Sequence, residues 1–292
     1  MEWLIAPFEV SFVQRALWGG VLVSVICALA GTWVVVRGMA FLGEAMAHGM
    51  LPGVAVASLA GGNLMLGGAL SAAAMACGVT VLGRSRRFAQ DTAIGLLFVA
   101  MLAAGVIIVS YSGSFAVDLT SILFGDVLAV RSQDLLQLGV ALALAAVVCA
   151  AGHRAFVALS VDRRTATALG LRPRVAHGAL LLLLTLAIVS SLHVVGTLLV
   201  VGLLVAPPAA AMFWADRLPL VMVGAALLGS AATVIGLLVS WHAGTAAGAT
   251  IALVAVALFG LSALFSVLLS RLRPRRDAAR AVSPEPLPER TP

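Results

Sequence analysis

Long apolar runs separated by short polar breaks dominate this chain of 292 residues. A helix needs about 20 apolar residues to cross the hydrocarbon core of a bilayer, and helices satisfy their own backbone groups in lipid. Hydrophobic residues make up 62% of the chain and charged residues 10%, whereas soluble domains carry about 25% charged residues. These values exclude a water-soluble globular enzyme and predict an all-α polytopic membrane protein. The runs are 13–36, 41–60, 63–83, 92–111, 133–152, 176–192, 194–213, 218–240 and 249–270.

The number of spans and their orientation follow from the breaks between the runs. The stretch 176–213 is interrupted only by His193-Val194-Val195-Gly196, so eight and nine transmembrane helices are both open. Every arginine-rich break comes after an odd-numbered run. Because arginine-rich loops stay in the cytoplasm, we expect a cytoplasmic C-terminus and, with nine spans, an N-terminus outside. We expect a transmembrane domain over 1–270 and a disordered cytoplasmic tail over 271–292, where prolines are frequent and periodicity is absent.

The basic residues and the cysteines limit which classes of protein and which partners fit the chain. All 18 basic residues are arginine, and a phosphate-binding P-loop requires a lysine, so this chain cannot hydrolyse ATP by that route. The arginines gather at span ends, as topology signals do, so we expect no nucleic-acid partner. The three cysteines lie singly in apolar runs and are interpreted as packing residues. His153 and His177, which lie among arginines, are expected to be solvated.

One polar motif lies inside an apolar run, at Glu44 and His48. If Arg37 marks the membrane edge, His48 lies roughly 16 Å deeper at about 1.5 Å per residue, near the midplane. The i,i+4 spacing places both side chains on one helix face. Pro52 has no N–H to donate to the His48 carbonyl, so we expect a kink there and a free carbonyl oxygen.

Carboxylate and imidazole are ligands that suit zinc and that manganese or iron(II) accept. Ionisable groups at this depth usually face a pathway or each other, so Glu44 and His48 are predicted to contact a metal ion transiently. The alternative is a hydrogen-bonded pair that only packs the bundle. Asp91, His193 and His242 are secondary pathway candidates. A helix N-cap explains Asp91 equally well, and interface anchoring explains the two histidines.

Two further segments are predicted to be short helices at the membrane surface. In the loop between the fifth and sixth runs, Asp162 can cap two turns over 163–169 that Gly170 ends. This amphipathic segment within 160–171 is either a topology-setting loop or a surface that inserts into a partner. The other segment, 112–132, is too polar to cross the membrane and is expected on the outer face.

Several motifs, taken in order, resemble the metal-ion branch of ABC importer permeases, above all the zinc permeases. The resemblance covers roughly 10–270, and it is the ordered spacing of the motifs that makes it specific. The motif with Glu44 and His48 has an acidic position that is more often aspartate in the family, so Glu44 departs mildly from it. The matching segments are Phe41–His48 with Leu51-Pro52-Gly53, Asp91–Gly95, Leu123–Asp126 with Leu128-Ala129-Val130, Ala168-Leu169-Gly170, Val195–Val200 through Ala206-Pro207, and Asp216–Pro219.

The resemblance implies a vitamin-B12-importer-like (type II) permease, homodimeric, in the bacterial inner membrane. It implies two separate ATPase subunits and a periplasmic or lipid-tethered metal-binding protein as partners, with no bound cofactor. Glu44 and His48 would line the path of zinc or, alternatively, of manganese or iron. The coupling helix would comprise Asp162, Arg163, Arg164, Thr165, Ala168, Leu169 and Gly170.

The residues alone leave two other mechanisms open. A proton-coupled secondary transporter would use Glu44 and His48 as a proton relay, and paired broken helices in inverted repeats would support it. The chain has no such repeats. An intramembrane metalloenzyme would need a zinc motif such as HExxH, whereas this chain has Glu-x-x-x-His without a third ligand nearby.

Overall fold

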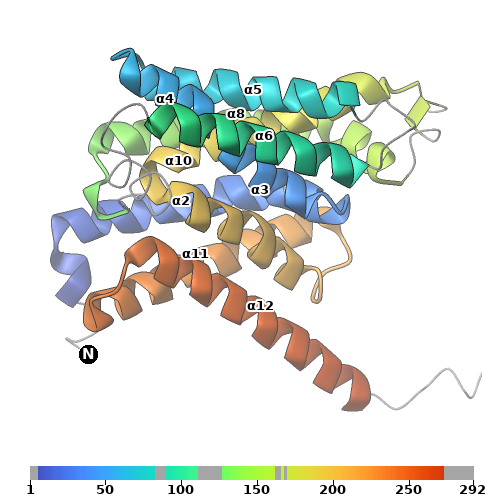
Figure 1. Ribbon diagram of the computed structural model, residues 1–292. Helices are drawn as coiled ribbons and strands as arrows, with labels where there is room; N and C mark the ends of the chain where they lie inside the picture. Colours follow the sequence, from blue (N-terminus) through green and yellow to red (C-terminus); the bar gives the residue numbers. More distant parts are fainter. Residues whose placement is uncertain (1–5, 83–89, 111–126, 162–165, 168–169, 273–292) are drawn as a thin grey trace, which may run out of the picture.

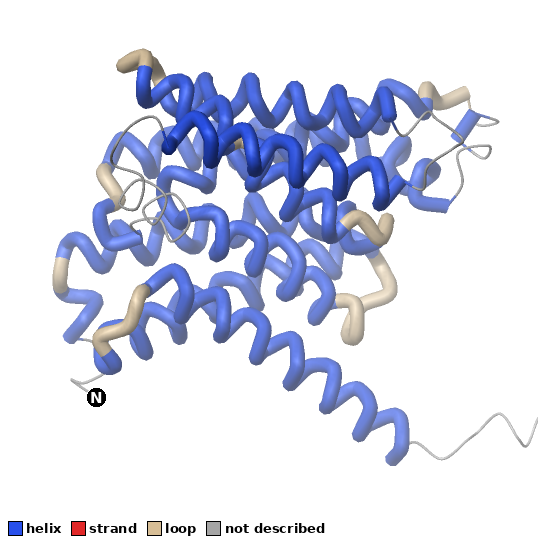
Figure 2. The backbone as a smooth tube through the Cα atoms, in the orientation of Figure 1, coloured by secondary structure: helices blue, strands red, loops and turns tan. Residues whose placement is uncertain are grey.

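The computed structural model describes residues 6–82, 90–110, 127–161, 166–167 and 170–272, and all regular structure in this part is helical. Long helices run side by side, and their connections lie at the two ends of the bundle (Figures 1 and 2). In chain order the elements are η1 (Ala6–Glu9), α2 (Ser11–Val36), α3 (Ala40–Gly49), α4 (Leu51–Leu59), α5 (Leu64–Leu82), α6 (Gln90–Ser110), η2 (Val127–Ala129), α8 (Ser132–Val161), α10 (Pro173–Ala211), α11 (Leu218–Ala243) and α12 (Ala247–Leu272).

Nine helical segments of the described part are long and apolar enough to cross a membrane, which confirms the predicted all-α polytopic fold. The stretch for which the sequence allowed either one span or two, and so eight or nine in total, lies in α10. Its 39 residues would extend about 58 Å as one straight helix, nearly twice the thickness of the hydrocarbon core. Gly196 breaks it, with φ 73° and ψ 167°, and the ribbon doubles back (Figure 1). Pro173–Leu192 and Val194–Ala211 therefore form two spans.

The centre of the bundle is built from α2 and the second half of α10. About two thirds of the most apolar window of α2 is buried (67%), as is 72% of Val194–Ala211, against 17% for α12. α2 packs against α8, α10 and α11, and α10 also packs against α3 and α12. The outer helices carry exposed leucines and valines, as expected for spans that face lipid.

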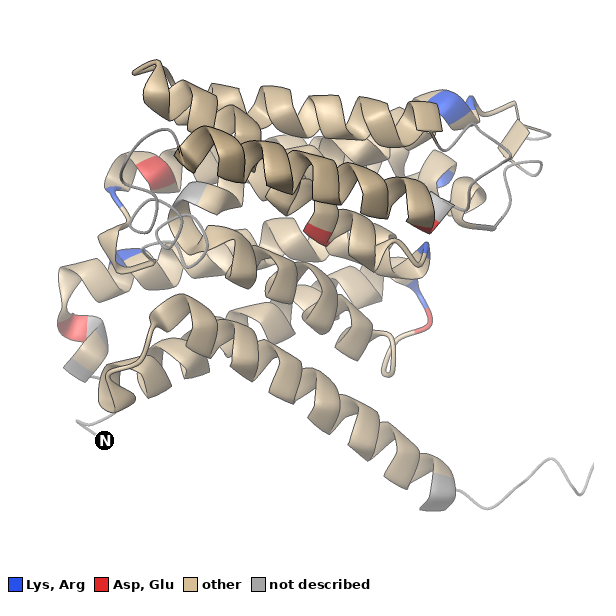
Figure 3. Cartoon of the chain, viewed as in Figure 1, with Lys and Arg blue, Asp and Glu red and all other residues tan. Residues whose placement is uncertain are grey.

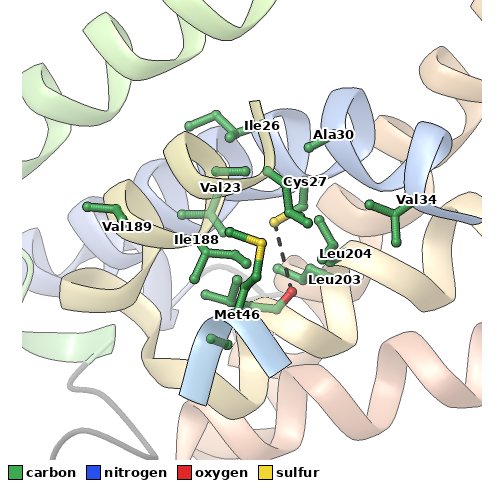
Figure 4. Close-up of a cluster of buried hydrophobic side chains, with 14 of the residues drawn as sticks. Val23, Ile26, Cys27, Ala30, Val34, Met46, Ile188, Val189, Leu203 and Leu204 are labelled. Carbon is green, nitrogen blue, oxygen red and sulfur yellow. Dashed lines mark hydrogen bonds between the residues drawn. The ribbon is translucent and has the colours of Figure 1, made fainter. Parts of the chain in front are cut away.

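The core between α2 and α10 also holds the helix α3. Met46 of α3 lies among the side chains of Cys27, Ile188 and Leu203 (Figure 4). At Gly43 a Cβ atom would lie 2.7 Å from the Leu204 side chain, so the absence of a side chain lets α3 lie close to α10. One face of α3 is therefore anchored in the centre of the molecule.

Charged side chains gather at the two ends of the bundle, with little charge between them (Figure 3). Such a distribution is typical of helices that span a membrane. The fifth span differs from its predicted bounds, because α8 continues past 152 to Val161. His153 and Arg154 therefore lie on a helix rather than in a break. Most of the predicted surface segment 112–132 and nearly all of the predicted tail lie outside the described residues.

Candidate metal path

The helix α3 has one buried face and one polar, open face. Leu42, Ala45 and Met46 are fully buried. On the other face Phe41 and Glu44 are exposed, and His48 is half-buried. Residues spaced by three, four and seven share a helix face, so Phe41, Glu44 and His48 form a single stripe. The structure thus confirms that Glu44 and His48 lie on one face of one helix.

The stripe extends to the middle of a candidate membrane span. The span containing it runs from Ala40 to Leu59, so His48 lies next to its midpoint. Glu44 and His48 are about 6 Å apart along the helix axis. A carboxylate facing hydrocarbon at this depth is costly. The open face of α3 therefore has to meet water, an ion or another protein surface.

The expected kink follows directly after His48. α3 ends at Gly49 and α4 begins at Leu51, and Pro52 lies in the first turn of α4. The prediction of a free His48 carbonyl was wrong, because the Met50 N–H donates to it. The next carbonyl is also satisfied, since the Ser71 hydroxyl of α5 donates to the Gly49 oxygen at 2.7 Å. The backbone oxygens at the kink are therefore used within the protein.

The imidazole of His48 is held by an aromatic ring rather than by a hydrogen bond. Its Nδ1 is buried and has no hydrogen-bond partner among the described atoms. The ring lies edge-on to Phe98 of α6, with centroids 5.6 Å apart and an interplanar angle of 74°. Phe98 also contacts Phe41, at 5.9 Å. Sequence analysis missed Phe98, because a phenylalanine inside an apolar run carries no local signal.

Glu44 and His48 offer one carboxylate and one imidazole to an ion. No group of three or more histidine, cysteine or acidic side chains that could hold a metal ion occurs in the part of the chain that the structure describes. A closed structural zinc site requires four ligands. The stripe is therefore chemically suited to weak, passing contact with a divalent ion that keeps other ligands, such as water.

The secondary candidates lie on other helices, Asp91 on α6, His193 on α10 and His242 on α11. Asp91 is exposed in the first turn of α6. α6 is described from Gln90 onward, and the N-cap interpretation of Asp91 stays a prediction. His242 is exposed in the last turn of α11, with its Nδ1 2.8 Å from the Leu238 carbonyl. His193 lies in α10 three residues before Gly196, and its side chain is outside the described part.

The predicted coupling segment is described only in part. Asp162, Arg163, Arg164, Thr165, Ala168 and Leu169 lie outside the described residues. Ala166 and Thr167 are helical, and Ala166 is buried. Gly170 has φ +70°, and its N–H donates to the Thr167 carbonyl at 3.0 Å. This left-handed conformation ends helical turns, as expected for glycine at that position.

A second cluster contains side chains that could bind a metal, but it is closed. The Trp33 indole N–H donates to the Cys149 sulfur at 3.3 Å, and the Cys149 thiol is directed at the Met222 sulfur at 4.0 Å. Trp33, Cys149 and Met222 are all buried. The thiol is thus hydrogen-bonded inside the core, in agreement with the packing role predicted for it.

The two histidines expected to be solvated are both half-buried. His153 lies edge-on to Trp33, with centroids 5.6 Å apart. His177 lies with its Nδ1 3.4 Å from a guanidinium nitrogen of Arg37. Both contacts join elements far apart in the sequence, which is why the neighbouring arginines gave the wrong expectation.

Comparisons with known proteins show which family the chain resembles. The sequence profile of the ABC 3 transport family matches residues 9–266. The manganese transport system membrane protein MntC of Listeria monocytogenes is 37% identical, over 91% of this chain and 95% of that protein. A probable iron transport system membrane protein of Haemophilus influenzae is 34% identical, over 92% of this chain and 99% of that protein. Among solved structures, PsaBC from Streptococcus pneumoniae in complex with Fab is 30% identical with a TM-score of 0.80, over 89% of this chain and 94% of that one.

Proposed function

Because the chain belongs to the ABC 3 transport family, whose profile matches residues 9–266, we propose that it is the membrane-spanning permease of an ATP-driven importer of divalent metal ions. The observation that carries the proposal is the open stripe of Glu44 and His48 at mid-membrane depth. These are oxygen and nitrogen ligands where an ion has to cross. They attract the ion, and their small number lets it leave.

Manganese is the ion that we propose first. Sequence analysis favoured zinc, with manganese or iron as the alternative. The relatives compared above are named for manganese in Listeria monocytogenes and for iron in Haemophilus influenzae. Carboxylate oxygen suits manganese, and one imidazole is compatible with it. Zinc and iron(II) are the other outcomes of the same transport assay.

We propose the partners on two grounds: the chain has no lysine for a P-loop, and its Glu44 carboxylate is exposed. A chain without lysine cannot form a P-loop, so separate ATPase subunits hydrolyse ATP in our proposal. The exposed carboxylate of Glu44 needs a cover within the membrane. A second copy of this chain, placed against the open face of α3, provides that cover and makes the path a channel between two copies. A metal-binding protein on the outer side delivers the ion.

In this proposal, the coupling segment within 160–171 transmits the effect of ATP hydrolysis to the stripe of Glu44 and His48. Residues 160–171 connect α8 to α10, and α10 packs against α3. A push from the ATPase on this segment moves α10 against α3, at the close contact between Leu204 and Gly43. Such a motion opens the path alternately to the two sides of the membrane. We place this segment and the C-terminus on the cytoplasmic side.

Uptake of radioactive Mn²⁺ into vesicles tests the proposal. The permease is reconstituted with its ATPase and its metal-binding protein, and ATP is supplied on the ATPase side. The double substitution Glu44→Gln with His48→Asn replaces the carboxylate and the imidazole by neutral amides, which are weaker ligands, so we expect uptake to fall about 100-fold, which corresponds to about 2.7 kcal/mol. Asp216→Asn changes an exposed carboxylate at the end of the bundle and is the matched control. It is expected to keep normal uptake.

Two results contradict the proposal. Normal uptake by the double variant shows that the ion takes another path. Uptake that needs no ATP but follows a proton gradient identifies a secondary transporter, in which Glu44 and His48 relay protons.

A further inference from the structure

We propose that Phe98 is a positioning residue, which fixes the orientation of the His48 imidazole and thereby sets the affinity of the path for the ion. This inference rests on the proposed function, because it assumes that His48 contacts the transported metal. It adds a residue from a second helix, α6, to a stripe that otherwise comes from α3 alone.

The first argument is the way in which His48 is held. A histidine that binds a metal is normally oriented by a hydrogen bond from its second ring nitrogen to a carboxylate or carbonyl. The Nδ1 of His48 is buried and has no such partner among the described atoms. A ring without that hydrogen bond can turn about its χ2 bond unless neighbouring atoms prevent it. The edge-on contact with Phe98, at 5.6 Å, supplies the missing restraint.

The second argument is the position of Phe98 relative to the whole stripe. Its ring contacts both Phe41 and His48. These two residues lie seven apart on one face of α3, with Glu44 between them. Phe98 therefore forms an apolar wall along one side of the stripe. Such a wall keeps His48 from turning toward α6 and leaves it directed toward the open face that Glu44 occupies.

The third argument is that α6 holds Phe98 firmly. Ile94, one turn before it, is 2% exposed. Gly105, two turns after it, lies so close to α4 that a Cβ atom would be 2.8 Å from the Leu51 Cβ. Phe41, in contrast, is 42% exposed. Of the two phenylalanines, Phe98 is thus the fixed one, and Phe41 packs against it.

Three substitutions separate positioning from packing. Phe98→Leu keeps an apolar side chain but removes the ring edge. Phe98→Tyr keeps the ring. Phe41→Leu removes the other ring contact of Phe98 without touching His48, and it is the matched control. The measurement is the Mn²⁺ concentration for half-maximal uptake together with the maximal rate, in vesicles carrying the complete ATP-driven complex.

Loss of a group that orients a metal ligand typically weakens metal binding by about 10- to 100-fold. We expect Phe98→Leu to raise the half-saturating Mn²⁺ concentration about tenfold with little change in the maximal rate. Phe98→Tyr and Phe41→Leu are expected to stay within about twofold of the unsubstituted protein. A purely structural role would lower the maximal rate through loss of folded complex and leave the half-saturating concentration unchanged.

The outcomes also separate this inference from the proposed function. If Phe98→Leu leaves the half-saturating concentration unchanged while His48→Asn raises it, the positioning role is refuted and the metal path stands. If Phe98→Leu and Phe41→Leu raise it equally, the effect belongs to general packing and the inference is also refuted. If neither Glu44→Gln nor His48→Asn alters uptake, the proposed function itself fails.

Discussion

His48 and His153 both lie edge-on to an aromatic ring, with the ring centroids 5.6 Å apart in each case. Their surroundings differ. Beside His153, the indole of Trp33 donates to Cys149, and the Cys149 thiol points at Met222, all in the buried core. Beside His48, Glu44 is exposed, and the Nδ1 of His48 itself has no partner among the described atoms.

The difference shows that residue types alone do not identify a metal path. The Trp33 cluster holds a thiol, a thioether and an imidazole, which are good ligands for soft metals, yet its indole N–H and its thiol bond within the protein. The stripe has fewer ligand types, but its Glu44 carboxylate is exposed near the middle of a candidate span. Because an unmade hydrogen bond in a low-dielectric medium is costly, the open region is the one whose polar groups need an external partner.

The largest effect on stability is expected from Trp33→Ala. This substitution removes a fully buried indole and its contacts with Cys149, His153 and Phe156. Truncation of a buried tryptophan costs about 3–5 kcal/mol. The unfolding temperature of the detergent-solubilised protein should fall strongly, while the half-saturating Mn²⁺ concentration of the remaining folded complex stays normal. A changed half-saturating concentration would mean that the cluster belongs to the path.

A smaller loss of stability is expected from Cys149→Ala. It leaves the indole N–H of Trp33 without its acceptor and opens a small space in the core, which together cost about 1–3 kcal/mol. Thermal unfolding measures the loss, and Mn²⁺ uptake serves as the control that should not change. Cys77→Ala, at an exposed cysteine, is the matched substitution and should leave both measurements unchanged.

The substitution His48→Leu is expected to change the stability of the protein in the opposite direction. Replacing a buried nitrogen without a hydrogen bond by carbon removes a desolvation cost, so the variant should be as stable as the unsubstituted protein or about 1 kcal/mol more stable. Mn²⁺ uptake should nevertheless fall about tenfold, since a metal ligand is lost. A variant that is both destabilised and normal in uptake would reverse the comparison and make His48 a packing residue.

Local periodicity explains what could be predicted from the sequence. The apolar runs place the spans, the i,i+4 spacing places Glu44 and His48 on one face, and Pro52 places the kink. Each of these features depends on residues within one or two helical turns of each other. They could therefore be derived without knowledge of how the helices pack.

Contacts between segments far apart in the sequence explain which features could not be predicted from it. Phe98 reaches His48 from another helix, and Ser71 reaches the Gly49 carbonyl from α5. Likewise His153 was expected in a loop, although α8 continues past it and packs it on Trp33. Helix packing decides these positions, and the sequence of one helix carries no record of which neighbour it meets.

The central claim is that the open face of α3 meets an aqueous ion path rather than lipid. Glu44→Cys, made together with Cys77→Ala, leaves only the buried Cys27 and Cys149 as other thiols. The reaction with a charged, membrane-impermeant thiol reagent is measured in the reconstituted complex. Leu70→Cys, at a position that is 72% exposed on α5, is the lipid-facing control. We predict that the reagent modifies Glu44→Cys, that Mn²⁺ slows this reaction, and that Leu70→Cys resists it. If Glu44→Cys reacts only with a membrane-soluble maleimide, as Leu70→Cys should, Glu44 faces lipid and the proposed metal path is wrong.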